Sequence, residues 1–495
     1  MGEPDGLNFK SPSAPLASPV DTAPCLRGMV DVLSRMSAPE SSKPNLLAIA
    51  WPIFVEQGLR ILIGIVDFYM VSQISEGAAA ALDVSNRLLF ACLIIFNFVA
   101  IGASVVITHH LGSGDRTGAG RITTNAIAVN TWLGAITSVA VFLGAAPLLR
   151  MMKMPDHLMA FGLPFLSLMG GTLFMEAMNM SIAGTLRAHK HTRDAMFVIG
   201  AQNILNVAGN CVLLYGLFGA PKMGVTGVAL SSVFSRCCAC VAFWVLLDYR
   251  THLRLRVRDF FAISWPVIRR VLRIGLPAAA ENGCYLSALM LVTTFTARLG
   301  EDSLAIQAFA FNLQRFVILF SISIGLGTEI MVGHLVGAGR LEEAYHGLLR
   351  SLRTGLVVAL VGILIIAAAS PWLMTLFSKR PEIIASTVHL LYLSILIETG
   401  RVFNIVVINS LRATGDVGFP LKMAVLSMWG VWVPLAWALG LWLGFGLPGI
   451  WIAMATDEWL RGLLMHRRWK QRHWMKTSAR ARAHVTAATD DAALA

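Results

Sequence analysis

Apolar residues fill most of this chain in runs of about 20 or more, separated by short polar stretches, from Leu46 onwards. A helix of about 20 apolar residues crosses the roughly 30 Å of hydrocarbon in a bilayer, whereas a soluble helix is apolar on one face only. The pattern therefore predicts an all-α integral membrane protein. Its twelve predicted spans are residues 46–73, 84–109, 122–146, 159–184, 196–216, 225–248, 273–297, 304–334, 352–376, 384–410, 420–442 and 449–465.

The polar segments predict how the chain is divided. Residues 1–43 are rich in Pro and Ser and are expected to form a disordered tail. A first lobe (44–250), a basic linker (251–272), a second lobe (273–465) and a basic tail (466–495) follow.

Composition and charge agree with a membrane protein. Hydrophobic residues make up 56% of the chain and charged residues 14%, and the mean hydropathy is +0.67. The net charge of +12 is expected to face anionic lipid, so the predicted partner is the bilayer and not nucleic acid. The predicted inner loops carry more than twice as many Lys and Arg as the outer loops, which places both termini in the cytoplasm and the protein in the plasma (inner) membrane.

An internal repeat with an offset of 225 residues divides the spans into two sets of six. It relates Pro52 and Glu56 to Pro277 and Glu281, His109 and Gly112 to His334 and Gly337, and Leu186-Arg187-Ala188 to Leu411-Arg412-Ala413. Because six is an even number, both halves enter the membrane from the same side and are related by a pseudo-two-fold axis along its normal. The cleft between two such bundles is where secondary transporters bind substrate.

Several motifs are absent from the sequence. It contains no Gly-x-x-x-x-Gly-Lys-[Ser/Thr] phosphate loop and no His-Glu-x-x-His metal motif. We therefore expect that the protein is not an enzyme and binds no cofactor. We also expect an ion gradient to be its energy source.

Six acids fall inside the predicted spans, where a charge needs either a partner or a task. They are Glu56, Asp67, Glu176, Glu281, Glu329 and Glu398. Glu56 and Arg60 are four residues apart on one helix face, which predicts a structural ion pair or a gating pair.

Asp67 has no basic residue three or four positions away, so it is the main candidate for a titrating or cation-binding group. Asn203, Asn206 and Asn210 share one face of the fifth span and are its expected neighbours. A carboxylate with amide oxygens can bind Na⁺, and the same carboxylate in a dry pocket can carry a proton. The alternative is that the Asn residues only bind neighbouring helices.

The second lobe offers four further charged candidates. Glu281 has Tyr285 where Glu56 has an Arg, which favours binding of a cationic substrate. Glu329 lies towards the cytoplasmic end of its span, where we expect it to reach headgroup water. Glu398 and Arg401 are three residues apart and are expected to pair.

The sequence resembles the multidrug and toxic compound extrusion (MATE) family over about residues 46–465. The segments that carry the resemblance are Gly64-Ile-Val-Asp67-Phe-Tyr-Met70, Gly112-Ser-Gly-Asp115, Leu186-Arg-Ala188, Leu205-Asn206 with Asn210, Gly275-Leu-Pro277 with Glu281, Gly333 to Arg340 and Leu411 to Asp416. The resemblance implies a V-shaped pair of six-helix lobes with a central cleft. It also implies export of amphipathic, often cationic compounds in exchange for H⁺ or Na⁺.

Carried over residue by residue, Asp67 matches the family's ion-coupling carboxylate, and Asn206 matches the Asn of the fifth-helix motif. Asn210 stands where many members have Asp, so the first lobe has one proton-carrying group fewer. Arg401 stands where one branch has Asp, so Glu281 or Glu398 would have to serve as a second-lobe ion site.

The function expected from the sequence is that of a monomeric, ion-coupled antiporter for small-molecule drugs or metabolites. A flippase for a lipid-linked oligosaccharide and an exporter of one narrow metabolite class are the alternatives. A membrane-embedded enzyme or a receptor is less favoured, because the chain shows no paired catalytic groups and no extramembrane domain.

Overall fold

The computed structural model describes residues 46–479, which fold almost wholly into helices, with no strand among them. The first half contains α2 (Leu46–Ser72), α3 (Glu76–Gly112), α4 (Arg116–Met151), α5 (Asp156–Gly171), α6 (Leu173–Ala188), α7 (Thr192–Tyr215), η1 (Leu217–Gly219) and α8 (Gly224–Thr251). The second half contains η2 (Val257–Phe260), α9 (Trp265–Arg298), α10 (Glu301–Gly337), α11 (Leu341–Phe377), α12 (Pro381–Ala413), α13 (Gly418–Ser427), η3 (Met428–Trp432), α14 (Val433–Trp437), η4 (Ala438–Trp442) and α15 (Gly446–Lys470). The predicted N-terminal tail and residues 480–495 lie outside the described part.

Within residues 46–479, nine segments are long and apolar enough to span a bilayer, one of them the run from α13 to η4. The pair α5 and α6 makes a tenth span that is bent by 47°. The Thr172 hydroxyl at this bend donates to the carbonyls of Leu168 and Met169, which satisfies backbone groups that the break would leave free. The remaining two predicted spans correspond to α9 and α15, whose charged residues lower their hydropathy.

Several helices extend beyond the predicted spans, and two of them cross the predicted domain boundaries. Helix α9 begins at Trp265, inside the segment predicted as a linker, and α15 continues to Lys470, beyond residue 465. Pro266 lies in the first turn of α9, where its missing N–H leaves no helical bond unmade. The helix therefore starts before its apolar part does.

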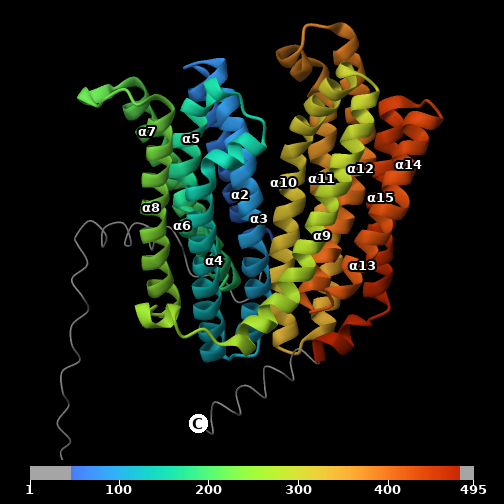
Figure 1. Cartoon of the computed structure of the whole chain (residues 1–495). Coiled ribbons are helices and arrows are strands. Elements are labelled where there is room, and N and C mark those ends of the chain that lie inside the picture. The colour runs from blue at the N-terminus through green and yellow to red at the C-terminus, as the bar shows by residue number, and fades with distance from the viewer. Residues whose placement is uncertain (1–45, 480–495) are drawn as a thin grey trace, which may run out of the picture. The chain divides into compact units, whose positions relative to one another are not determined.

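The spans form two six-helix bundles, α2 to α8 and α9 to α15 (Figure 1). The first bundle packs around an apolar core that includes Phe96 and Phe165, and the second around one that includes Trp432 and Trp451. This arrangement confirms the predicted fold class of two repeat-related bundles.

The bundles touch through a symmetric contact at the ends of α3 and α10. His109 Nε2 lies 2.6 Å from the carbonyl oxygen of Ala413 in the second bundle, and His334 Nε2 lies 2.8 Å from the carbonyl oxygen of Ala188 in the first. Both histidines and both alanines are repeat mates at the offset of 225. We call this pair of cross-bundle hydrogen bonds the histidine latch.

Glycines bring the two backbones together beside the latch. A Cβ atom on Gly112 would lie 2.2 Å from the His334 carbonyl oxygen, and one on Gly337 would lie 2.2 Å from the His109 carbonyl oxygen. Only glycine permits so close an approach.

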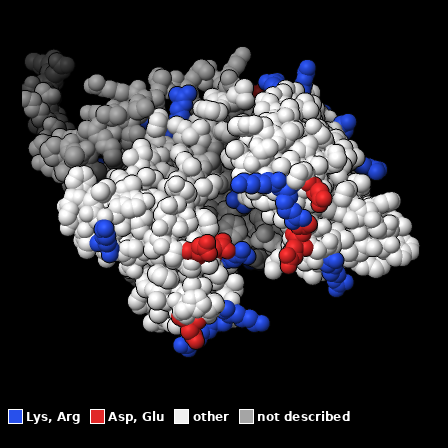
Figure 2. Space-filling model, turned by 90° about the horizontal axis from the view of Figure 1, so that it is seen from above, with Lys and Arg blue, Asp and Glu red and all other residues white. Residues whose placement is uncertain are grey.

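Further contacts between the bundles lie on the same side. Gly102 on α3 faces the backbone of Gly275 on α9, and Phe54 on α2 stacks on Phe320 of α10 with ring centroids 4.1 Å apart. These contacts lie towards the end where α2 begins and α15 ends, which we call the terminal side (Figure 1). Seen from the opposite end, the surface is hollowed between the bundles (Figure 2). The predicted cleft thus opens away from the terminal side.

Substitution of an interface glycine tests this packing. Gly337→Ala places a methyl group against the His109 backbone, and overpacking of this kind costs about 1–3 kcal/mol. We expect it to lower the thermal unfolding midpoint of the purified protein by several degrees. Gly58→Ala on α2 is the matched control, because no atom lies within 4 Å of its added methyl group. Equal midpoints for the two variants would contradict the close approach.

Candidate functional site

Asp67 on α2 lies in the interior of the first bundle, with 9% of its surface exposed. Asn210 Nδ2 on α7 donates to Asp67 Oδ1 at 2.6 Å, and Ser232 Oγ on α8 donates to Oδ2 at 3.4 Å. Asn206 Nδ2 donates to Ser232 Oγ at 2.9 Å, and its Oδ1 accepts from Asn210 Nδ2 at 3.2 Å. Two helices, α7 and α8, thus surround the carboxylate with amide and hydroxyl groups.

The carboxylate of Asp67 has no ion-pair partner among residues 46–479. Beside it, Asn210 Oδ1 is buried and has no hydrogen-bond partner there. An unpaired carboxylate in the membrane interior is costly unless it binds a proton or a cation. Carboxylate, amide and hydroxyl oxygens also suit a hard cation. The site is therefore chemically able to hold one H⁺ or one Na⁺.

The three Asn residues of α7 have different roles. Asn203, Asn206 and Asn210 are all buried, but Asn203 Nδ2 donates to the Ile199 carbonyl of its own helix at 2.9 Å. Asn206 and Asn210 alone join the group around Asp67. Ser232 was not a sequence candidate, because nothing in the sequence singles it out from Ser231 and Ser235 on the same helix.

Two ion pairs with buried carboxylates occupy equivalent places in the two bundles. Arg187 Nη1 at the end of α6 donates to Glu56 of α2 at 2.7 Å, and Arg412 Nη2 at the end of α12 donates to Glu281 of α9 at 2.7 Å. The partners are repeat mates, so each pair ties the first span of its bundle to the end of the fourth. The sequence offered Arg60 as a partner for Glu56 and no partner for Glu281, since both Arg187 and Arg412 lie on other helices.

The pair in the first bundle continues into a chain of charges. Arg60 lies 3.3 Å from Glu56 and 3.5 Å from Glu176, and Glu176 lies 3.1 Å from Arg236 of α8. Arg236 had no partner that the sequence could assign, because Glu176 belongs to α6.

Glu329 on α10 is 3% exposed, and no ion pair or hydrogen bond of the described residues includes it. The expectation that it reaches headgroup water is wrong for this conformation. Ile49 and Ile53 of α2 pack with the adjoining Ile330, and the contact between the bundles excludes solvent. Glu329 is thus a lone acid in the interface between the bundles.

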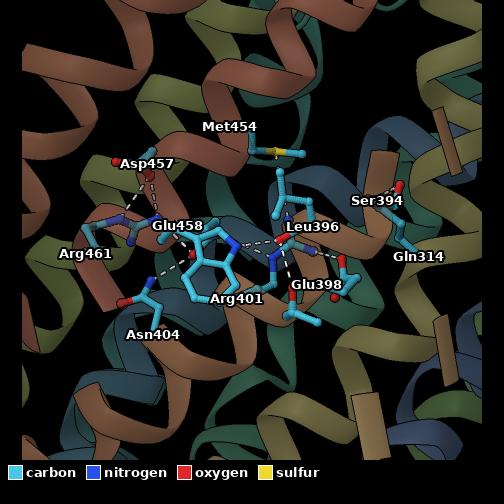
Figure 3. A network of polar contacts seen from close by, with 12 residues as sticks. Gln314, Ser394, Leu396, Glu398, Arg401, Asn404, Met454, Asp457, Glu458 and Arg461 are labelled. Carbon is cyan, nitrogen blue, oxygen red and sulfur yellow. Dashed lines mark hydrogen bonds and ion pairs between the residues drawn. The ribbon is translucent and has the colours of Figure 1, made fainter. Parts of the chain in front are cut away.

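The second bundle holds a cluster of charges between α12 and α15 (Figure 3). Arg401 Nη1 bonds Glu398 Oε1, and Arg401 Nε lies 3.4 Å from Glu458 of α15. Asp457 and Arg461 extend the cluster along α15 through a contact of 2.6 Å. The sequence candidates did not include the charges of α15, although Asp457 and Arg461 have the four-residue spacing of a helical ion pair.

An apolar groove of about 400 Å³ lies between α10 and α11, apart from these charges. Its walls include Phe316, Phe320, Val361 and Ile365. Apolar helix surface of this kind packs against lipid, so we assign function to the charged groups and not to the groove.

The MatE family model matches residues 52–212 and 277–438. Its two matches begin at Pro52 and Pro277, which are repeat mates, so it recognises each bundle separately. The chain belongs to the MatE family. MatE membership confirms the resemblance found in the sequence and makes this chain a multi-pass membrane protein of a transporter family.

Relatives of this MatE chain match along nearly its whole length. An "uncharacterized transporter YisQ" from Bacillus subtilis is 38% identical over 441 residues, which are 89% of this chain and 97% of the relative. The "probable multidrug resistance protein NorM" of Thermotoga maritima is 24% identical over 92% of this chain and 97% of its own. The "multidrug resistance protein PmpM" of Pseudomonas aeruginosa is 24% identical over 83% of this chain and 86% of its own.

Solved structures show the same MatE fold. A MATE protein "in the bent conformation" superimposes with a TM-score of 0.80 at 18% identity, over 88% of this chain and 96% of that one. A multidrug resistance MATE transporter described as outward-facing superimposes with a TM-score of 0.79 at 18% identity, over 88% and 95%. At this identity the likeness concerns the fold alone.

The ion pair at Glu56 gives a test of stability. Glu56→Gln leaves Arg187 without its anion, and removal of one partner of a buried pair costs about 3–5 kcal/mol. We expect this variant to unfold at a clearly lower temperature in detergent. The double variant Glu56→Gln with Arg187→Met should recover most of the loss, because no unpaired charge remains. Glu382→Gln, at an exposed site on α12, is the control, and a double variant no more stable than Glu56→Gln would contradict the pairing.

Proposed function

We propose that this protein is an efflux transporter that exports amphipathic, cationic drugs or metabolites in antiport with H⁺ or Na⁺. The observation that carries the proposal is Asp67, a buried acid without a cationic partner, held by Asn210 and Ser232. The transporter works as a monomer in the plasma (inner) membrane with both termini in the cytoplasm, and it is not an enzyme. The relatives named as multidrug resistance proteins support the substrate class.

Alternating access would follow from competition at the first bundle. Binding of H⁺ or Na⁺ neutralises Asp67 and favours one arrangement of the bundles, and bound cationic substrate favours the other. This coupling is reciprocal, so the ion must weaken substrate binding as much as the substrate weakens ion binding. With the termini in the cytoplasm, the conformation described here is open to the outside, because the terminal side is closed by the histidine latch.

The arrangement of the buried Arg residues argues against a flippase for lipid-linked sugars. Such a substrate carries a pyrophosphate, which would need unpaired cations in the cleft. The buried residues Arg236, Arg401, Arg412 and Arg461 instead each contact a carboxylate. We therefore favour a cationic substrate.

Substitution of Asp67 tests the proposal directly. We expect a proton or Na⁺ gradient to drive ethidium uptake into inverted vesicles, and Asp67→Asn to abolish the driven part, because the neutral amide takes up no proton and lacks the negative charge that attracts Na⁺. Asp83→Asn, an exposed acid of the same bundle that pairs with Arg87, should leave uptake unchanged. Within α7, Asn210→Ala should weaken coupling several-fold and Asn203→Ala should not, because only Asn210 contacts Asp67. Driven uptake that persists in Asp67→Asn would refute the proposed coupling site.

The histidine latch predicts a shift in conformation. Each hydrogen bond contributes about 0.5–1.5 kcal/mol, so the double variant His109→Ala with His334→Ala should lose about 1–3 kcal/mol, a roughly 5- to 150-fold change in the conformational equilibrium. Spin labels at Arg116 and Glu343 on the terminal side should then show a larger population at long distance. His389→Ala, an exposed His of α12, is the control. A distance distribution identical to that of the wild type would show that the latch does not hold this side closed.

A further inference from the structure

The charged cluster of the second bundle is sealed from solvent. Glu398 is fully buried, and Arg401, Asp457, Glu458 and Arg461 are each at most 5% exposed. Arg401 contacts Glu398 and Glu458, and Arg461 contacts Asp457 and Glu458. The five groups thus form one continuous network between α12 and α15 (Figure 3).

The network contains three carboxyl groups and two guanidinium groups. An Arg stays protonated in proteins, so the network carries one negative charge when every acid is ionised and no charge when one acid is protonated. Among the nearby side chains from other helices, Tyr285 of α9, Gln314 of α10 and Ser427 of α13 are neutral at pH 7. Glu281 of α9 also acts on Arg461, but it is paired with Arg412, so the missing cation is not supplied from there. A net charge sealed in the membrane interior is costly, which favours the neutral form.

The three carboxyl groups differ in how well they are held. Glu458 receives bonds from Arg401, Arg461 and Asn404, the last at 2.9 Å. Asp457 receives two bonds from Arg461 and one from Ser427.

Glu398 is held least of the three. It contacts Arg401 alone, through Oε1. Its other oxygen, Oε2, is buried and has no hydrogen-bond partner among the described residues. A carboxylate with the fewest donors is the one whose ionised form is stabilised least, so the proton belongs on Glu398.

Comparison of the two bundles shows which groups of the network have counterparts in the first bundle and which occur in the second bundle alone. In the first bundle Glu176 pairs with Arg236 at 3.1 Å, and in the second Arg401 pairs with Glu458 at 3.4 Å. Arg401 is the repeat mate of Glu176 at the offset of 225. Towards the end of each half the offset falls to 222, because the second half is three residues shorter there, so Glu458 is the repeat mate of Arg236. The pair thus recurs with its charges exchanged. This pair is balanced in both bundles.

The additional groups occur in the second bundle only. The repeat mate of Glu398 is Leu173, and that of Asp67 is Val292. Each bundle therefore has an acid outside the shared pair, but at a different place. Asp67 in the first bundle is surrounded by amides, whereas Glu398 in the second adjoins an Arg.

We propose that Glu398 is a second proton-carrying group of the transport cycle, which takes up a proton from water on one side of the membrane and releases it on the other. A metal cation does not fit this place, because Arg401 stands against the carboxylate and repels it. The role rests on the proposed antiport and adds one proton to its stoichiometry. Glu398 would then couple the second bundle to the proton gradient, separately from the ion that Asp67 binds in the first bundle.

Two polar side chains near Glu398 provide the route by which its proton leaves. Ser394 lies one turn before Glu398 on the same face of α12, and its hydroxyl accepts from Gln314 Nε2 of α10 at 2.6 Å. Gln314 Oε1 is buried without a partner of its own among the described residues. Because α10 takes part in the contact between the bundles, movement of α10 against α12 would bring water to this pair.

Infrared difference spectroscopy of the full-length protein in liposomes tests for the proton itself, without any substrate. We expect a carbonyl stretching band of a protonated carboxyl at neutral pH that is lost in Glu398→Gln and shifted in Glu398→Asp. Glu382→Gln, with its exposed side chain, should keep the band. A band unchanged in Glu398→Gln would overturn the proposal.

Stability provides a second criterion. Glu398→Gln mimics the protonated form and should unfold at the same temperature as the wild type, whereas Glu458→Gln, which loses contacts to two Arg residues, should be strongly destabilised. A Glu398→Gln variant that fails to fold would show that the ionised form is required, and would also overturn the proposal.

Ethidium counterflow against a set proton gradient then measures the stoichiometry. We expect the number of protons exchanged per ethidium ion to fall by one in Glu398→Gln. If no gradient drives ethidium in the wild type, the proposed antiport fails while the infrared band still reports on Glu398. If the band is present and the stoichiometry is unchanged in the variant, Glu398 holds a fixed proton and its role in the cycle is refuted.

Discussion

A charged side chain in the hydrocarbon region costs about 2.5 kcal/mol or more unless a partner neutralises it, and this constraint accounts for much of the helix packing. The pairs Glu56 with Arg187 and Glu281 with Arg412 join the first span of each bundle to the end of the fourth. Among the described residues, few charged side chains inside the helices lack such a partner. Asp67 is one of them, and the function proposed here depends on it.

Local periodicity explains which parts of the site the sequence could predict. Residues three or four apart on a helix share a face, so the partners Glu398 and Arg401 and the common face of Asn206 and Asn210 follow from spacing alone. The partners of Glu281 and Glu176 do not, because they come from other helices and depend on how the bundle packs. The repeat predicted the two bundles because it shows which segments correspond. It could not predict these contacts, because it does not show which side chains meet in space.

The two bundles share a backbone plan but differ in their charges. One buried pair appears in both with its acid and base exchanged, Glu176 with Arg236 and Arg401 with Glu458. A pair can reverse in this way without loss, because its energy depends on opposite signs and not on which helix carries which sign. The acids outside this pair, Asp67 and Glu398, are placed differently in the two halves, so the ion sites proposed for the two halves are not equivalent.

The contact between α3 and α10 limits how the bundles can move. Backbone meets backbone at Gly112 and Gly337, so no layer of flexible side chains lies between the helices to absorb a small displacement. Such an interface has a threshold: it stays intact under weak force and parts as a whole once that force is exceeded. A transporter with such an interface would pass between two discrete conformations. The close backbone contact at the two glycines would disfavour a half-open intermediate and so suppress leakage through it.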